Sequence, residues 1–302
     1  KMERLSQFYI DGKWVAPVSD LNMPVINPAT ERQVGTLALG NRDDVDHAVA
    51  AAKAAFSSYS VSSKTMRIDL LHKVKDITKR RFEDLAQAMR VEMGAPITMS
   101  RNAQTDAALG HLESFIDALE KLQDRVTLAN GDVMVREPIG VCGLITPWNW
   151  PVNQIVLKVL PALATGCTCV LKPSEHTPIS AMIYAEIIDE AGYPPGVFNL
   201  INGEGPIVGS AMSQHHDIQM MSFTGSVRGG TAVTQDAAET VKRVTLELGG
   251  KSPNLVFADC NLQKCVSDSV AECMYNTGQS CDAPTRLLVE KSCYDEVLKI
   301  AK

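Results

Sequence analysis

The chain has 302 residues, of which 45% are hydrophobic and 21% are charged, and its formal net charge is −6. This composition is typical of a globular protein large enough for two domains. The acidic balance, without a dense Lys/Arg run, argues against a nucleic-acid partner. No stretch approaches the roughly 18 consecutive apolar residues of a membrane span, so no membrane partner is expected either.

The first residues, KMERLSQFYIDGKW, lack the apolar core of a secretion signal, and we expect a cytoplasmic protein. The eight cysteines include no C-x-x-C spacing and are interpreted as reduced thiols. Cys167 and Cys169 lie in an apolar stretch without a nearby histidine, so no metal site is expected.

Residues 1–40 predict short strands and turns, with a hairpin at Asp11-Gly12 between residues 8–10 and 13–15. Helical spacing of apolar residues follows from Asp43, and again over 67–79 and 82–93. We expect one long helix over 97–122. None of these helices contains a cluster of reactive groups, and we assign them to the scaffold. Strand-like residues 133–138 end in charges and a proline, which is typical of an edge strand or a protruding arm.

From Gly140 onward, strands and helices alternate. This rhythm predicts an α/β fold, a Rossmann-like parallel sheet with helices on both faces, whose ligands bind beyond the carboxyl ends of the strands. A second alternation then begins and predicts the start of a second α/β domain. The expected strands lie at 140–146, 167–171, 197–201, 220–223, 244–247, 254–257 and 286–289, and the expected helices at 155–163, 178–191, 206–212, 229–237 and 262–274.

Two strand ends suggest nucleotide contacts, although no G-x-G-x-x-G fingerprint is found. Phe223-Thr224-Gly225-Ser226 leads into a helix whose first amides could hold a phosphate, or it is a plain strand–helix turn. Lys172 and Glu175 could grip a ribose diol, or they are two solvated charges on a loop. A carboxylate at position 175 would repel a 2′-phosphate and so favour NAD over NADP.

Three further residues suggest chemistry. Asn149, between Trp148 and Trp150, offers a neutral donor that suits a developing oxyanion, or it belongs to a loop packed by tryptophan. Glu247 lies between two leucines, a setting expected to raise the pKa of a carboxyl that serves as a base, or it is an exposed charge at a strand end. Cys281 lies on a loop where a thiol can be both exposed and held still, or it is a packed cysteine near a turn.

Together these segments resemble the aldehyde dehydrogenase superfamily. The motifs are PWNWP at 147–151, KPSEHTP at 172–178, FTGS at 223–226, ELGGKSPN at 247–254 and NTGQSC at 276–281, and the likeness extends over essentially the whole chain.

The resemblance implies an NAD-binding domain from 1–122 and 139–249. It implies an oligomerisation arm at 123–138, and a homodimer or homotetramer for the full-length protein. Residues 250–302 match the beginning of the family's catalytic domain, and the family's C-terminal third is expected to be missing.

The resemblance also implies a role for each matching residue in NAD-dependent oxidation of an aldehyde to a carboxylic acid through a thiohemiacetal and a thioester. Cys281 matches the nucleophile, Glu247 the general base, and Asn149 the oxyanion donor together with the Cys281 backbone N–H. The positions expected to bind NAD are Thr146, Pro147, Trp148, Lys172, Ser174, Glu175, Gly205, Gly209, Phe223, Thr224, Gly225, Ser226, Leu248 and Gly249.

Two other functions remain open. The chain could be a cofactor-binding or scaffold remnant of the family in which the thiol is idle. A thiol hydrolase or transferase would need a histidine base, and His176, His215 and His216 have no recognisable partner motif nearby.

Overall fold

The computed structural model describes residues 2–302, with side chains described from Arg4 onward. The chain forms two compact units, one ending at Leu246 and the other running from Glu247 to Lys302. The division falls just before residue 250, where the sequence suggested that a catalytic domain begins. Each unit is described by itself.

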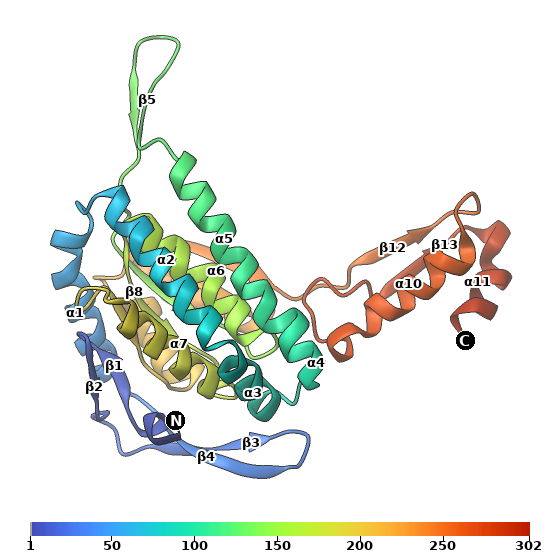
Figure 1. Ribbon diagram of the computed structural model, residues 1–302, viewed down its shortest axis with the longest axis horizontal. Coiled ribbons are helices and arrows are strands. Elements are labelled where there is room, and N and C mark those ends of the chain that lie inside the picture. Colours follow the sequence, from blue (N-terminus) through green and yellow to red (C-terminus); the bar gives the residue numbers. More distant parts are fainter. Residues whose placement is uncertain (1) are drawn as a thin grey trace. The chain divides into compact units, whose positions relative to one another are not determined.

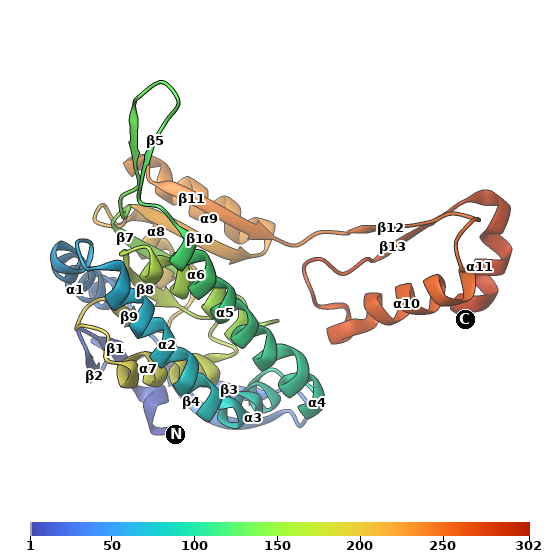
Figure 2. The ribbon, with the colours of Figure 1, turned by 45° about the horizontal axis from the view of Figure 1, so that its top comes forward.

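The first unit is built around a seven-stranded sheet in the order β11-β10-β7-β8-β9-β1-β2 (Figure 2). Strands β10, β7, β8 and β9 are parallel, as expected, whereas β1 pairs antiparallel with both β9 and β2. The sequence predicted the β1–β2 hairpin but not that it extends the parallel sheet. The strands are β1 (Phe8–Ile10), β2 (Lys13–Val15), β7 (Val141–Ile145), β8 (Thr168–Lys172), β9 (Phe198–Leu200), β10 (Met220–Gly225) and β11 (Arg243–Leu248).

Helices cover both faces of this sheet because alternate strand residues point to opposite sides. Val141 and Ile145 pack in a cluster with residues of α1, α8 and α9, whereas Cys142 and Leu144 pack in a second cluster with residues of α2, α5, α6 and α7. In Figure 1 the helices α2, α5, α6 and α7 lie side by side on that second face. The predicted fold class is therefore confirmed.

The helices of the first unit begin and end at local sequence signals. Asn41 caps α1 in a capping box with Asp44, Ser63 caps α2, and α7 ends at Gly192, whose φ is 82°. The helices are α1 (Arg42–Tyr59), α2 (Lys64–Arg80), α3 (Phe82–Glu92), α4 (Ile97–Met99), α5 (Asp106–Lys121), α6 (Pro151–Ala164), α7 (Pro178–Ala191), α8 (Ser210–Gln214) and α9 (Val227–Ala237), with short helices η1 (Met2–Ser6), η3 (Gly205–Gly209) and η4 (Ala238–Thr240).

The expected long helix over 97–122 is not regular. It consists of α4, a π-helical segment η2 (Ser100–Thr105), and α5. The wider π turn changes which side chains face inward, and such segments are frequent near functional sites.

Two small antiparallel sheets complete the first unit. Strands β3 (Asn22–Asn27) and β4 (Arg32–Ala38) form one, and β5 (Arg125–Thr127) and β6 (Val133–Val135) form the other. Figure 1 shows the β5–β6 hairpin extending away from the helices. Its use in oligomer formation stays a prediction.

The second unit contains a parallel pair of strands and two helices. Its elements are β12 (Pro253–Val256), α10 (Leu262–Met274), η5 (Tyr275–Gly278), β13 (Arg286–Val289), η6 (Lys291–Cys293) and α11 (Tyr294–Ala301). Its buried core cluster consists of Val256, Val266, Cys293 and Val297. In neither unit does a helix among residues 2–302 have both the length and the apolar character needed to cross a membrane.

Candidate functional site

Three of the sequence motifs meet at one edge of the sheet. Ile145 at the end of β7 is paired with both Lys172 at the end of β8 and Phe223 near the end of β10. The backbone N–H of Thr146 donates to the carbonyl of Lys172 at 3.2 Å. Parallel strands in register thus place the loops after β7, β8 and β10 together, as Rossmann-like ligand sites require.

Lys172 and Glu175 form an ion pair at this edge, with 3.0 Å between Nζ and Oε2. The Lys172 ammonium also donates to the carbonyl of Pro173 at 3.0 Å. The Lys172 side chain is 3% exposed and that of Glu175 is 25% exposed. They are therefore a held pair rather than two solvated charges.

Burial and pairing act against each other in this pair. Burial lowers the pKa of Lys172 although the Glu175 and Glu204 carboxylates favour its charged form. Burial of Glu175 opposes ionisation, but the neighbouring ammonium outweighs it and holds the pKa of Glu175 below its usual range. The contact with Lys172 holds the Glu175 side chain in place, and Glu175 lies at the edge of a cavity.

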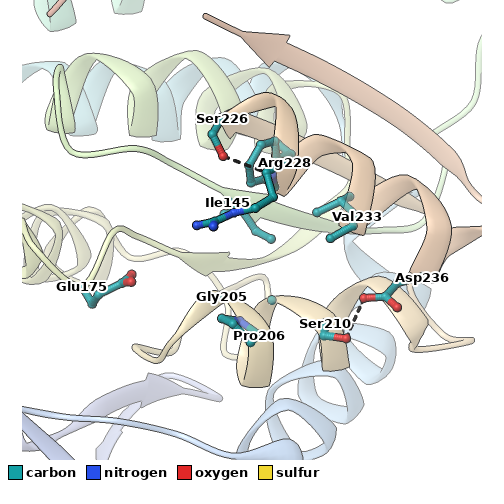
Figure 3. Close-up of a pocket in the computed structure, with 13 residues that line it drawn as sticks. Ile145, Glu175, Gly205, Pro206, Ser210, Ser226, Arg228, Val233 and Asp236 are labelled. Atoms are coloured by element: carbon teal, nitrogen blue, oxygen red, sulfur yellow. Dashed lines mark hydrogen bonds between the residues drawn. The ribbon is translucent and has the colours of Figure 1, made fainter.

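That cavity has a volume of about 600 Å³ and lies between the strand ends, η3, α8 and α9 (Figure 3). Five of the residues expected to bind a cofactor line it, and the rest of its wall comes from residues that the sequence analysis missed. The expected ones are Glu175, Gly205, Gly209, Phe223 and Ser226, and the missed ones are Ile145, Pro206, Ser210, Arg228, Gly229, Ala232, Val233 and Asp236.

The start of α9 forms one side of this cavity. Ser226 is its N-cap, and its Oγ accepts a hydrogen bond from the backbone N–H of Gly229 at 3.1 Å. A Cβ atom at Gly229 would lie 2.6 Å from Cζ of the Phe223 ring, and a Cβ at Gly225 would lie equally close. Glycine at these positions lets the helix approach the strand closely enough for Phe223 and Ser226 to share one wall.

Several missed residues follow from the geometry of α9. Gly229, Ala232, Val233 and Asp236 are three or four positions apart and so share one face of the helix. Figure 3 shows Asp236 bonded to Ser210 of α8, at 2.6 Å, which joins the two helices. The spacing of these four α9 residues could have revealed them, but only with the knowledge that this face of the helix borders a cavity.

The other expected cofactor positions do not line the cavity. Thr146 and Thr224 are buried beside it, Trp148 is 41% exposed, and the Ser174 hydroxyl accepts from the backbone N–H of His176 at 3.3 Å. Pro147 and Gly225 lie in the adjoining loops. Leu248 and Gly249 belong to the second unit.

Asn149 lies in the loop that leads into α6. Its backbone carbonyl accepts a hydrogen bond from Gln104 Nε2 at 3.0 Å. Gln104 is fully buried and lies within the π-helical segment η2. The sequence analysis assigned this region to scaffold only, and nothing in its periodicity indicated that it steadies the Asn149 loop.

Cys281 is the only exposed cysteine among residues 2–302. The backbone just before it reverses through consecutive left-handed residues, with φ of 50° at Asn276, 56° at Thr277 and 69° at Gly278. Such conformations are strained for residues other than glycine and cluster at functional sites. The expected combination of access and a fixed turn is therefore present in the second unit.

The expectation for the surroundings of Glu247 is wrong. Glu247 was expected between leucines in an apolar setting, yet its side chain is exposed near the end of β11. Within an exposed, alternating strand the flanking leucines point to the opposite side, so they do not enclose the carboxyl.

The segment after Glu247 runs beside the segment that holds Cys281. Arg286 donates from its backbone N–H to Ser252 O at 3.3 Å and from Nε to Lys251 O at 2.8 Å. A Cβ at Gly250 would lie 3.6 Å from the carbonyl oxygen of Cys281. The parallel pairing of β12 with β13 therefore brings the two motifs, ELGGKSPN and NTGQSC, into contact inside the second unit.

The model of the aldehyde dehydrogenase family matches residues 14–302. The chain belongs to the aldehyde dehydrogenase family. A relative of this chain, the 3-succinoylsemialdehyde-pyridine dehydrogenase of a Pseudomonas species, is 50% identical over all of the chain, which spans 63% of that relative's length.

Solved structures of aldehyde dehydrogenases superpose closely on this chain. Aldehyde dehydrogenase C of Pseudomonas syringae, a cysteine-to-alanine mutant complexed with NAD+ and octanal, has a TM-score of 0.97 and 48% identity, with 100% of this chain and 62% of that chain covered. The NAD+ complex of an aldehyde dehydrogenase from Bacillus cereus has a TM-score of 0.94 and 35% identity, with 98% and 61% covered.

Proposed function

We propose that this chain contains the cofactor-binding unit and the reactive thiol of an NAD-dependent aldehyde dehydrogenase, which oxidises an aldehyde to a carboxylic acid. The observation on which this rests most is the exposure of Cys281, shortly after a left-handed turn and beside the segment that follows Glu247. The family membership supplies the reaction class, and the cavity of the first unit supplies a place for the cofactor.

The residues at the cavity fit the adenosine diphosphate half of NAD. Its apolar wall, with Pro206 and Val233, suits a flat base. The fixed Glu175 carboxylate suits a ribose diol, and the N-terminus of α9 at Ser226 suits a phosphate. When bound, NAD would supply the hydride acceptor.

The proposed thiol chemistry would use Cys281, Asn149 and Glu247. The Cys281 thiolate would add to the aldehyde carbonyl, and the amide of Asn149, with the Cys281 N–H, would stabilise the oxyanion of the resulting thiohemiacetal. After oxidation the acyl group would remain on Cys281 as a thioester. Glu247 would take a proton from water, and the hydroxide would release the acid and return the thiolate. Exposure of Glu247 allows this water to reach it.

The remaining roles are proposed on the same family grounds. Residues 1–122 and 139–249 would form the NAD-binding domain, and residues 250–302 would belong to the catalytic domain. The β5–β6 arm would serve contacts between subunits of a cytoplasmic homodimer or homotetramer. Leu248 and Gly249 would contact the nicotinamide half of the cofactor.

A second candidate is a chain that binds NAD without turning over aldehyde. The favouring observation is that the 302 residues span 63% of the length of the Pseudomonas relative.

Appearance of NADH during incubation with a short aliphatic aldehyde separates these candidates. We expect turnover by the 302-residue chain, loss of at least 1,000-fold in Cys281→Ala, and little change in Cys265→Ala, a half-buried cysteine of the same unit. Equal rates in all three proteins would contradict the role of Cys281. NAD binding without turnover by any of them would favour the second candidate.

A further inference from the structure

Arg228 is the cation among the side chains that line the cavity of the first unit. It is the second residue of α9, two positions after the cap Ser226. Figure 3 shows its guanidinium reaching from α9 over the cavity, on the side where Glu175 lies. The sequence motifs gave no role to this residue.

The charges around Arg228 leave it unpaired. The Arg228 guanidinium has no hydrogen bond or ion pair with any residue of the described range, 2–302. The two carboxylates that line the same cavity are engaged elsewhere: Glu175 with Lys172 at 3.0 Å, and Asp236 with Ser210 at 2.6 Å and with Gln214 at 3.0 Å. The guanidinium is thus an available positive charge at the cavity.

The position of Arg228 in its helix is electrostatically unfavourable without a ligand. The first turn of a helix has a partial positive charge, so a cation there is disfavoured and an anion is favoured. Helix α9 has 11 residues and its cap satisfies the N–H of Gly229 only. An anion at this end would meet both the remaining amides and the guanidinium, and a guanidinium matches the two oxygens of a phosphate.

We propose that Arg228 binds a phosphate group of the adenine nucleotide that occupies this cavity. The inference rests on the proposed use of the cavity for NAD, and it adds a cationic contact that selects phosphorylated ligands over adenosine. Two sources share this chemistry, the bridging diphosphate of NAD or ADP and the 2′-phosphate of NADP. Since Arg228 lies beside Ser226, whereas Glu175 is placed for the ribose, the diphosphate is the expected one.

Calorimetric titration with adenosine, ADP, NAD and NADP tests this contact on the whole 302-residue chain. We expect Arg228→Gln to weaken the binding of ADP, NAD and NADP by roughly tenfold each and to leave the binding of adenosine unchanged. Arg228→Lys should recover part of the loss, because it keeps the charge without the planar fork. Added salt should weaken the binding of ADP less in Arg228→Gln than in the unaltered chain. The matched control is Arg32→Gln, the same change at an exposed arginine of β4 that does not line the cavity.

The outcomes separate this inference from the function on which it rests. A loss confined to NADP would assign the contact to the 2′-phosphate and would contradict the preference for NAD attributed to Glu175. Affinities for ADP, NAD and NADP equal to those of Arg32→Gln, or an equal loss for adenosine, would overturn the inference while leaving NAD binding intact. Arg228-dependent binding of ADP without binding of NAD would overturn the proposed cofactor and keep the phosphate contact. If the unaltered chain binds none of the four ligands, both the phosphate contact and the proposed cofactor are overturned.

Discussion

The cavity of the first unit and the thiol segment of the second hold their functional groups in different ways. Around the cavity, Lys172 is 3% exposed and is fixed by a carboxylate and a carbonyl, on strands buried on both faces. In the second unit Cys281 and Glu247 are exposed, and the core cluster contains four buried residues. Packing positions the first set, whereas backbone conformation and one strand pair position the second.

This difference fits the roles proposed for the two sets of residues. A nucleotide is recognised by several weak contacts that must be in place together, which suits a rigid, pre-organised edge of a sheet. A nucleophilic thiol and a general base must reach substrate and water, so they lie at the surface. The second unit is also small, and a small unit buries a smaller fraction of its surface on folding than a large one does. We therefore expect substitutions near the cavity to change stability and affinity together, and substitutions near the thiol to change activity alone.

The largest expected effect concerns the two halves of the ion pair. Glu175→Gln leaves the almost fully buried Lys172 without its carboxylate and should lower the free energy of unfolding of the first unit by about 3 kcal/mol. Lys172→Met removes the buried charge itself and leaves Glu175, which is 25% exposed and can be hydrated, so stability should fall by less. Chemical denaturation followed by circular dichroism measures both.

The same pair separates stability from affinity. Both variants should bind NAD at least tenfold more weakly, because each removes a group proposed to hold the ribose. Two variants with equal stability would mean that Lys172 is better solvated than its burial indicates. Unchanged NAD affinity in both would remove the pair from the cofactor site.

The next effect is a pH dependence that only the first unit should show. Glu92, the last residue of α3, is buried and accepts from the backbone N–H groups of Ile179 and Ser180 at the start of α7. Burial raises the pKa of Glu92 to about 7 despite these hydrogen bonds. The folded state then binds its proton more tightly than the unfolded state, so stability should fall by roughly 2–3 kcal/mol as pH rises from about 4.5 to 7.

Glu92→Gln should reduce this dependence of stability on pH, since an amide does not titrate. Glu113→Gln, at an exposed position of α5, is the matched control and should keep it. Unfolding of the first unit followed at several pH values checks the sign. A stability that rises between pH 4.5 and 7 and does so equally in all three proteins would mean that other groups dominate and Glu92 is ionised throughout.

The smallest effect compares packing at one glycine of each region. A Cβ at Gly229 would lie 2.6 Å from the Phe223 ring, whereas a Cβ at Gly249 meets no atom within 4 Å. Gly229→Ala should destabilise the first unit by about 1 kcal/mol, because the crowding is only partly offset by the better helix propensity of alanine. The substitution should also push Phe223 into the cavity and so weaken the binding of NAD.

Gly249→Ala should change stability by less than about 0.5 kcal/mol. Thermal unfolding and NAD titration of both variants provide the comparison. If Gly249→Ala proved the more destabilising of the two, the second unit would be more tightly packed at this position than its structure indicates.

Much of the fold could be predicted from local sequence signals. The boundaries of α7, α10 and β13 agree with the expected ones, because proline, glycine and apolar periodicity mark them directly. The π-helical segment η2 and the pairing of β1 with β9 could not be predicted, since both depend on contacts between distant segments. Such tertiary effects leave no periodic trace in a single sequence.

The candidate site divides in the same way. Lys172, Glu175 and Ser226 were found because they lie at or just after strand ends, which the register of the sheet brings together. Arg228, Asp236 and Gln104 were missed because their importance depends on which helix face borders the cavity or the Asn149 loop. The expected surroundings of Glu247 were wrong because consecutive residues of a strand point to opposite faces, so the flanking leucines point away from the carboxyl.

Amide hydrogen exchange with and without NAD tests most directly whether the cavity of the first unit is the cofactor site. We expect NAD to slow exchange in residues 205–210 and 226–233, which border the cavity, and to leave strands β12 and β13 little changed. Saturable NAD binding with protection only in the second unit, or with none in either cavity segment, would contradict the proposed site.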